Sequence, residues 1–330
     1  MARDIKFSAG IWAFTGCADR FCTTGYRDPI SLEDQIRMAG NVKGLGGLIL
    51  QYPNVIHEEN ASEVKKLIED NGLEIAAVDA NIFGREFKNG GLSNANPTIR
   101  QKAVDVLKRT MDTAAAVGCR NAGLWPGQDG FDYPFQENLM EAWNRERDCI
   151  AEAARHNPDV RICIEYKVAE PRTHILVGSA GRALALCYEI GMDNIGVTFD
   201  VGHAFMAKES PAEAATYLAL HGKLFSIHFN DAYGCFDDDM IAGSIHIWQV
   251  LEMLYYMDRV GYDGWYGLDI FPCREDIIAA CELSIENIKD LREVALEIDS
   301  AKLEQTQAKG DAIDSHRYMR DFFFNRLKRS

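Results

Sequence analysis

Four segments in the second half of the chain decide the fold: ICIEYK at 162–167, GVTFDVGHA at 196–204, SIHFND at 226–231 and YGLDIF at 266–271. Each is an apolar run of the kind found in a covered strand, and each ends in polar side chains. The polar residues of interest are Glu165, Asp200, His228 and Asp269. They are separated by 35, 28 and 41 residues, and each interval suits one strand followed by one helix. The four segments therefore predict consecutive parallel strands whose carboxyl ends meet at one rim.

Similar apolar runs occur along the rest of the chain and bring the number of strand candidates to eight. Their ranges are 5–14, 46–52, 74–81, 121–125, 160–166, 195–200, 224–230 and 265–271. Amphipathic segments lie between them, including one capped by Ser31 and one that begins with Ser210 and Pro211. Further helices are expected over 97–117 and 276–298.

The alternation of strands and helices predicts an α/β fold, the (β/α)8 or TIM barrel, over residues 1–299. An open doubly wound sheet is the alternative, but no GxGxxG follows the first strand and polar residues end many strands. The last residues, 300–330, form an extension: a polar connector over 300–310 and an aromatic-rich helix over 311–329. We expect it to pack on its own barrel or on a second subunit of a homo-oligomer, with a membrane or partner anchor as the alternative.

The composition restricts the partners of this protein. The chain carries 35 Lys and Arg against 50 Asp and Glu, a net charge of -15. Nucleic acid and anionic membranes repel such a chain, so we expect neither as a partner. We find no signal peptide, no run of the roughly 20 apolar residues that a membrane span needs, and nine scattered cysteines. These features favour a cytoplasmic protein that handles neutral solutes or cations.

Three carboxylates and one imidazole at the same rim indicate a metal site. Taken singly, a strand-end Asp is commonly a helix cap, and His228 could be a hydrogen-bonded core residue. As a set, they place charges in apolar strands, where burial is costly unless the charges are paired or bind a metal. Oxygen ligands with one imidazole favour Mn²⁺ and suit Co²⁺ or Mg²⁺, whereas zinc more often binds sulfur or several imidazoles. We therefore expect a divalent metal held by Glu165, Asp200, His228 and Asp269.

The segment after His228 reads NDAYGCFDDDM, with three consecutive acidic residues at 237–239. One interpretation is a solvated acidic loop. The other is that Asp237 and Asp239 join Asp200 and His203 around a second metal.

Several of these segments match a known family. The matching pieces are VDANIF (78–83), LWPGQDGFDYP (124–134), IEYKVAEPR (164–172), FDVGHA (199–204), HFND with the later DDD (228–239), and GSIHIWQVLEMLYYM (243–257). In these pieces the chain resembles the xylose isomerase-like TIM-barrel superfamily, and within it is most similar to the L-rhamnose isomerases. The resemblance covers most of residues 8–295.

This resemblance implies roles for individual residues. A structural metal would be held by Glu165, Asp200, His228 and Asp269, and a second, catalytic metal by Asp200, His203, Asp237 and Asp239. Lys167 would donate to a substrate oxygen that becomes negative. Where the family carries a ring-opening histidine this chain has Gln51, which cannot act as a base at neutral pH, and nearby His57 is a candidate substitute.

The candidate residues fall into three groups. The catalytic candidates are Lys167, Glu165, Asp269 and Asp237. The residues expected to contact the substrate are Trp12, Gln51, Asn81, Trp125, Lys167, His203 and Asp237, with Phe83 as a further part of the wall. Further candidates for sugar specificity are Phe21, Asp79, Asp129, Phe131 and His246.

The expected activity is that of a metal-dependent aldose–ketose isomerase, which shifts hydride between C1 and C2 of a small-molecule sugar. The main alternative is a ketose 3-epimerase with two proton-transferring carboxylates. Against it, Asp269 is one methylene shorter than a glutamate, and Lys167 suits an isomerase. A metal-dependent lyase or deglycosidase is a further alternative on the same barrel. The non-enzyme alternative is a sugar-binding or scaffold protein.

Overall fold

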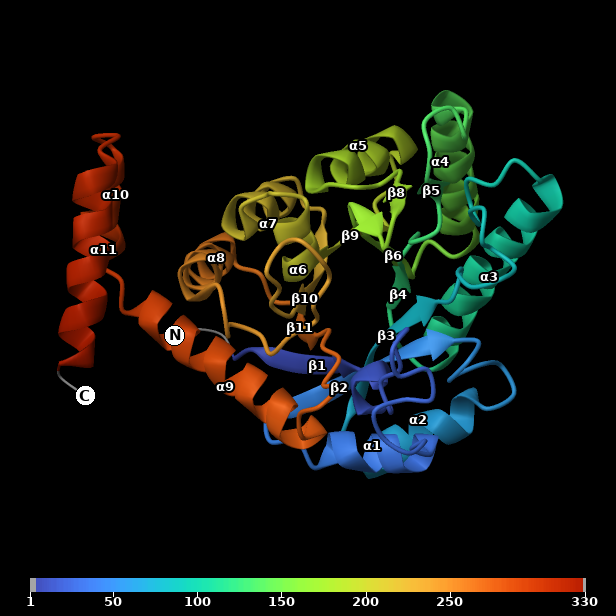
Figure 1. Cartoon of the computed structure of the whole chain (residues 1–330), viewed down its shortest axis with the longest axis horizontal. Coiled ribbons are helices and arrows are strands. Elements are labelled where there is room, and N and C mark those ends of the chain that lie inside the picture. The colour runs from blue at the N-terminus through green and yellow to red at the C-terminus, as the bar shows by residue number, and fades with distance from the viewer. Residues whose placement is uncertain (1–3, 329–330) are drawn as a thin grey trace.

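Eight parallel strands close into a barrel at the centre of the computed structural model, which describes residues 4–328 (Figure 1). They are β1 (Lys6–Gly10), β2 (Leu45–Tyr52), β3 (Glu74–Ala80), β4 (Asn121–Leu124), β6 (Arg161–Glu165), β9 (Ile195–Asp200), β10 (Leu224–Phe229) and β11 (Trp265–Leu268). Their order around the barrel is β1-β11-β10-β9-β6-β4-β3-β2, and β1 pairs with both β11 and β2. The predicted (β/α)8 barrel is therefore confirmed.

Helices follow the strands and cover the outside of the barrel (Figure 1). The principal ones are α1 (Leu32–Gly40), α2 (Ala61–Asp70), α3 (Pro97–Ala116), α4 (Leu139–His156), α5 (Ala180–Ile190), α6 (Val201–Met206), α7 (Pro211–Leu220), α8 (Ile247–Val260) and α9 (Ile277–Leu296). The predicted caps are present: the side chains of Ser31 and Ser210 accept hydrogen bonds from the backbone N–H groups of Asp34 and Glu213. Among residues 4–328, no helix combines the length and apolar character that a membrane span requires.

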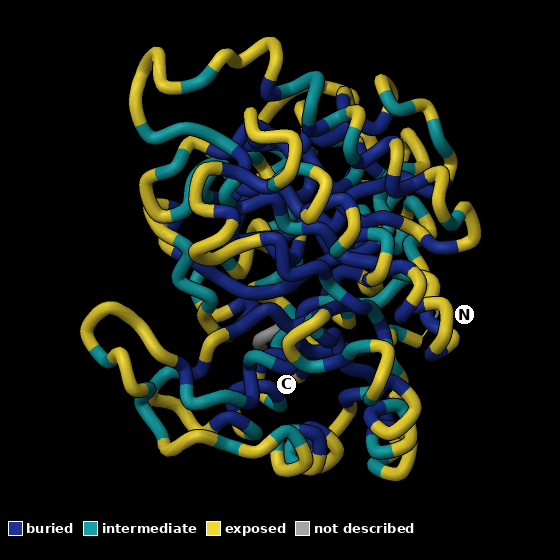
Figure 2. The backbone as a smooth tube through the Cα atoms, turned by 90° about the vertical axis from the view of Figure 1, so that its right-hand side faces the viewer, coloured by how far each residue is buried: buried dark blue, intermediate teal, exposed yellow. Residues whose placement is uncertain are grey.

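The strands are buried on both faces, as their continuous apolar sequences predict. Leu48, Phe199 and Ile227, from three different strands, are each 0% exposed. Figure 2 shows the buried backbone in the middle of the molecule and the exposed residues on the turns and loops around it. The polar residues at the strand ends are thus carried by a rigid, fully packed frame.

Two strands end several residues earlier than predicted, four others end one residue earlier, and a small sheet was not predicted. The first strand ends at Gly10 and is followed by the 3-10 helix η1 (Ile11–Phe14), so Trp12 lies at the rim rather than in a strand. The last strand ends at Leu268, one residue before Asp269. Beyond the rim, β5 (Gly130–Phe131), β7 (Ala169–Glu170) and β8 (Thr173–Ile175) form an antiparallel sheet of three strands. Strands of two or three residues are too short to show a period in the sequence.

The C-terminal extension is a helical hairpin, and part of its prediction was wrong. The expected connector, 300–310, contains the helix α10 (Ser300–Gln307), which Asp299 caps by accepting from the Lys302 N–H. The expected second helix is present as α11 (Ala312–Leu327), and its predicted end at residue 329 lies outside the described residues.

The hairpin packs on its own barrel, at one side of the molecule beside α8 (Figure 1). The Phe323 ring lies 5.2 Å from the ring of Trp248 on α8, and the Arg326 guanidinium pairs with Glu297 at 3.0 Å. Tyr318 and Phe322 are half-buried against the core. This arrangement is one of the two packings expected from the sequence.

Close packing between β9 and β10 leads to a test of the barrel. A Cβ added at Gly196 on β9 would lie 2.4 Å from the Phe225 ring, whereas a Cβ at Gly181 on α5 would meet nothing within 4 Å. We expect Gly196→Ala to lower the free energy of unfolding by about 1–3 kcal/mol through overpacking. The control, Gly181→Ala, should leave it unchanged or raise it by about 0.4–1 kcal/mol. Urea unfolding measures both, and equal midpoints would contradict the predicted packing.

Candidate metal centre and substrate cavity

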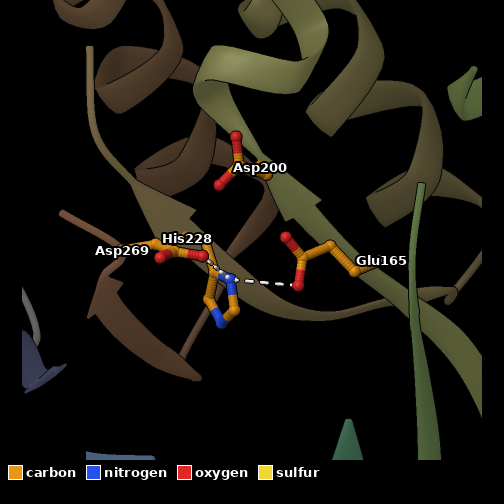
Figure 3. Close-up of side chains that lie close together, drawn as sticks. All are labelled: Glu165, Asp200, His228 and Asp269. Atoms are coloured by element: carbon orange, nitrogen blue, oxygen red, sulfur yellow. Dashed lines mark ion pairs between the residues drawn. The ribbon is translucent and has the colours of Figure 1, made fainter. Parts of the chain in front are cut away.

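Four neighbouring strands bring the predicted ligand residues to one point at the carboxyl-terminal rim. Glu165 and Asp200 end β6 and β9, His228 is the penultimate residue of β10, and Asp269 follows β11. Figure 3 shows their side chains pointing toward one another from these four strands. One potential ligand atom from each lies within 4.8 Å of the others. His228 Nδ1 is 3.2 Å from Asp269 Oδ2 and 3.4 Å from Glu165 Oε2.

A second group shares Asp200 with the first and adds His203 and Asp237. Asp200 caps the short helix α6, and its Oδ1 accepts the His203 N–H at 2.8 Å, which places His203 one turn beyond the strand. The ring Nδ1 of His203 lies 2.9 Å from the Tyr166 carbonyl oxygen, to which it can only donate. Nε2 lies 3.2 Å from Asp237 Oδ2, to which it donates when the ring is protonated, and its lone pair is available to a cation when the ring is neutral.

The acidic loop is folded inward at Asp237 rather than simply solvated. Its two ends are joined, because Asp231 and Met240 each donate a backbone N–H to the other's carbonyl oxygen at 3.1 and 3.0 Å. Asp239, predicted for the second ligand group, lies outside this compact group. Its Oδ1 instead accepts from Asn230 Nδ2 at 3.3 Å.

Lys167 lies beside the second group and is almost fully buried. Its Nζ is 2.6 Å from Asp237 Oδ2 and also pairs with Glu170, which lies on the short strand β7. Although burial lowers the pKa of Lys167, these two carboxylates raise it above its usual value, so the ammonium stays charged. The ammonium lies 5.3 Å from the centre of the Trp125 ring, which in turn meets Phe83 edge-on at 5.6 Å.

The electrostatics of both groups suit a cation. Burial raises the pKa of Asp200 to about 7, with His203 opposing the rise and Glu165 adding to it. Burial also raises the pKa of Asp239 far above its usual value, with a further contribution from Asp237. So many carboxylates cannot all stay ionised in a buried site without a compensating positive charge.

Each group contains a buried atom without a well-formed hydrogen bond, although one of them, His228 Nδ1, lies at ion-pair distance from Asp269 and Glu165. Within residues 4–328, the buried atoms His228 Nδ1 and Asp237 Oδ1 have no partner in hydrogen-bonding geometry. Buried polar atoms are nearly always satisfied, and one such atom in each group therefore needs an explanation. A divalent ion bound by oxygen and imidazole ligands would satisfy both, so the residues present fit a metal.

A cavity of about 620 Å³ opens above the ligand groups. The predicted site residues that line it are Trp12, Gln51, Asp79, Asn81, Phe83, Trp125, Glu165, Lys167, His203, Asp237, Asp239 and Asp269. Asp200 and His228, 0% and 4% exposed, are not part of its lining. More than half of the residues that line the cavity were therefore among those singled out from the sequence.

Other candidates for sugar specificity lie elsewhere. Asp129 is 0% exposed, and its Oδ1 accepts from the backbone of Gly91 and from both N–H and O–H of Ser93, so it organises two loops. His246 pairs with the buried Asp231 at 2.8 Å. The remaining candidates outside the lining are Phe21, His57 and Phe131.

The cavity also contains residues that the sequence analysis missed. Glu170, Asp19, Arg274 and Cys273 line it from the loops after β6, β1 and β11. Of these residues, only Glu170 could have been predicted from the sequence, because it lies three residues after Lys167 in the segment IEYKVAEPR. The others lie in irregular loops, where no period fixes which side chains turn inward.

A partly buried hydrogen bond to Asp269 gives a test of the first ligand group. Trp12 Nε1 donates to Asp269 Oδ1 at 2.7 Å and fixes the orientation of this carboxylate. We expect Trp12→Phe to weaken Mn²⁺ binding roughly 10–100-fold, measured by calorimetry. The matched control is Trp143→Phe, which removes an exposed Nε1 bond to Glu189 and should leave binding unchanged. Equal affinities of the two variants would show that Trp12 does not support a metal ligand.

The chain is similar in sequence to xylose isomerases and similar in fold to solved sugar epimerases. The xylose isomerase of Thermus thermophilus is 28% identical over 219 residues, which is 64% of this chain and 57% of that protein. The chain thus spans less than two thirds of the length of that relative. A solved D-tagatose 3-epimerase-like protein matches with a TM-score of 0.71 and 19% identity, over 89% of this chain and 99% of the other. A solved L-ribulose 3-epimerase gives a TM-score of 0.67 and 16% identity, over 90% and 99%.

The two structural matches show the fold alone at these identities. The family model for xylose isomerase-like TIM barrels matches residues 39–293, which is most of the chain. The chain belongs to the xylose isomerase-like TIM-barrel family.

Proposed function

We propose that this protein is a divalent-metal-dependent aldose–ketose isomerase. The observation that carries the proposal is the position of Lys167, a buried ammonium that contacts Asp237 at the edge of two ligand groups sharing Asp200. A cation at this place suits a reaction in which a sugar oxygen becomes negative. The similarity to xylose isomerases supports the same reading.

The two ligand groups would hold the metal ions. Glu165, Asp200, His228 and Asp269 would bind one ion, and Asp200, His203 and Asp237 a second, with Mn²⁺ favoured. A divalent ion bound by these residues would supply Lewis acidity toward the oxygens of an open-chain sugar.

The protein's own residues would hold the sugar and its charge. Lys167 Nζ would donate a charge-assisted hydrogen bond to the oxygen that gains negative charge as hydrogen moves between C1 and C2. Trp12, Phe83 and Trp125 present apolar surface at the cavity wall and would exclude water from the reacting carbons. Glu170 would keep Lys167 charged and correctly placed.

A ketose 3-epimerase is the second candidate, and one observation favours it. Glu165 and Asp269 approach the same point from β6 and β11, as two proton-transferring carboxylates would. The epimerases among the structural matches agree with this reading. However, Asp269 is held by the Trp12 hydrogen bond, and an epimerase mechanism gives the buried Lys167 no clear task.

Product analysis distinguishes these candidates. Aldoses and ketoses are incubated with the Mn²⁺-, Co²⁺- or Mg²⁺-loaded protein, and products are identified by NMR. We expect interconversion of an aldose with its 2-ketose. C3 epimers of a ketose would support the epimerase instead. A protein that takes up no stoichiometric divalent metal and shows no thermal shift with Mn²⁺ would contradict both enzyme proposals.

Removal of the ammonium tests its assigned role. We expect Lys167→Met to lower kcat by about 10²–10³-fold or more, because the developing negative oxygen loses its charged donor. Mn²⁺ binding should be largely retained, because Lys167 is not a ligand. Lys66→Met, which removes an exposed lysine on α2, is the control and should keep full activity. Turnover of the Lys167 variant at the wild-type rate would remove this residue from the mechanism.

A further inference from the structure

Any isomerase or epimerase that acts on free pentoses and hexoses needs an open-chain sugar, whereas these sugars are cyclic in water. Ring opening moves a proton from the anomeric hydroxyl to the ring oxygen and breaks the bond between the anomeric carbon and that oxygen. A side chain that accepts and returns a proton accelerates such a step. This inference rests on the proposed sugar substrate but not on the choice between isomerase and epimerase.

The rim of the barrel is divided into two unlike halves. Strands β6, β9, β10 and β11 carry the two ligand groups. Strands β1 to β4, on the other half, contribute mostly neutral side chains to the cavity, such as Trp12, Gln51, Asn81 and Trp125. Among the described lining residues from β2 to β4 and the positions just after them, Asp79 is the single ionisable side chain.

The structure makes specific room for this carboxylate. In the strand register, Asp79 lies between Gln51 on β2 and Gly123 on β4. A Cβ at position 123 would lie 2.0 Å from Asp79 Oδ1 and 2.5 Å from its Cγ. Only glycine at position 123 therefore leaves the carboxylate in its present place, directly over the neighbouring strand and within the cavity wall.

We propose that Asp79 is the catalytic residue that opens the sugar ring, with Gly123 leaving the room that its carboxylate occupies in the cavity wall. The Asp79 carboxylate takes the proton of the anomeric hydroxyl as the bond between the anomeric carbon and the ring oxygen breaks. The electron pair of that bond goes to the ring oxygen, which receives a proton from the Asp79 carboxyl. The carbonyl sugar is released to the ligand groups, and Asp79 returns to its starting state.

The charge state of Asp79 agrees with this role. Burial raises its pKa to about 7, with His228 opposing the rise and Glu165 and Asp269 adding to it. A group of this kind can both accept and return a proton near neutral pH.

Other residues near this wall are poorer candidates. Gln51 has no titratable proton, and His57 does not line the cavity. Asp19 does line it, but its Oδ1 accepts the backbone N–H groups of Phe21 and Cys22, both at 2.7 Å, and its Oδ2 accepts from Tyr26. Both oxygens of the Asp19 carboxylate therefore accept hydrogen bonds from its own loop, which makes it a poorer proton acceptor for a substrate.

Mutarotation isolates the ring-opening step from the later chemistry. Freshly dissolved α-D-xylose and 2-deoxy-D-glucose are followed by polarimetry with the Mn²⁺-loaded protein, and ketose formation is measured separately. The 2-deoxy sugar opens and closes but has no C2 oxygen, so it cannot be isomerised. We expect the wild-type protein to accelerate mutarotation, and Asp79→Asn to lose about 10²-fold or more of that acceleration.

The controls separate ring opening from folding and metal binding. Glu74→Gln removes an exposed carboxylate at the opposite end of the same strand and should behave as wild type. Gly123→Ala keeps the carboxylate but displaces it and should also lose mutarotation. Mn²⁺ affinity and thermal unfolding of Asp79→Asn should match the wild type, and its turnover of glyceraldehyde, which cannot form a ring, should fall far less than its turnover of xylose.

Two results would overturn the assignment. One is a wild-type protein that does not accelerate mutarotation, or an Asp79→Asn variant that does so equally well. The other is an equal loss of turnover on xylose and glyceraldehyde, which would place Asp79 in the later chemistry. Absence of ketose from a protein that still accelerates mutarotation would instead count against the proposed isomerase and leave the role of Asp79 standing.

Discussion

The site depends on the burial of one carboxylate, Asp200, at the end of β9. This group is 0% exposed, caps α6 through the His203 N–H, accepts from Asn230, and is common to both ligand groups. A buried ionised carboxylate is tolerated only when donors or cations surround it. The neighbouring Glu165 and Asp237 make that requirement stronger, because they add negative charge at the same place.

The residues around Asp200 also make the distribution of charge around the rim of the barrel uneven. A closed parallel barrel presents eight strand ends at one rim, and any of them can carry reactive groups. Here the potential metal ligands come from four consecutive strands or the residues just after them, so the charge is concentrated on one half of the rim. The other half can then be neutral and aromatic, which suits the faces of a sugar. Asp79 and Asp19 are the acidic residues that line the cavity on that half, and the position of Asp79 depends on the missing side chain at Gly123.

The sequence predicted the barrel and the first ligand group because both leave periodic signals. Polar residues that interrupt apolar strands at intervals of one strand–helix unit are visible without a structure, as for Glu165 and His228. Loops carry no such signal. Asp129 and His246 looked as functional as the true lining residues, yet both are bound to neighbouring protein groups. The sequence likewise could not predict that Asp237 belongs to the second ligand group and that Asp239 lies outside it. Both positions depend on the path of one loop.

The closure of that loop has a consequence for binding. Asp231 and Met240 hold its two ends together, and the Asp231 carboxylate also accepts the backbone N–H groups of Ile245 and His246 at the start of α8. The path of the chain through Asp237 is thus set by contacts that do not involve a ligand. Much of the conformational entropy of ordering the second group is therefore lost during folding, and an ion that bound there would meet ligands that are already in place.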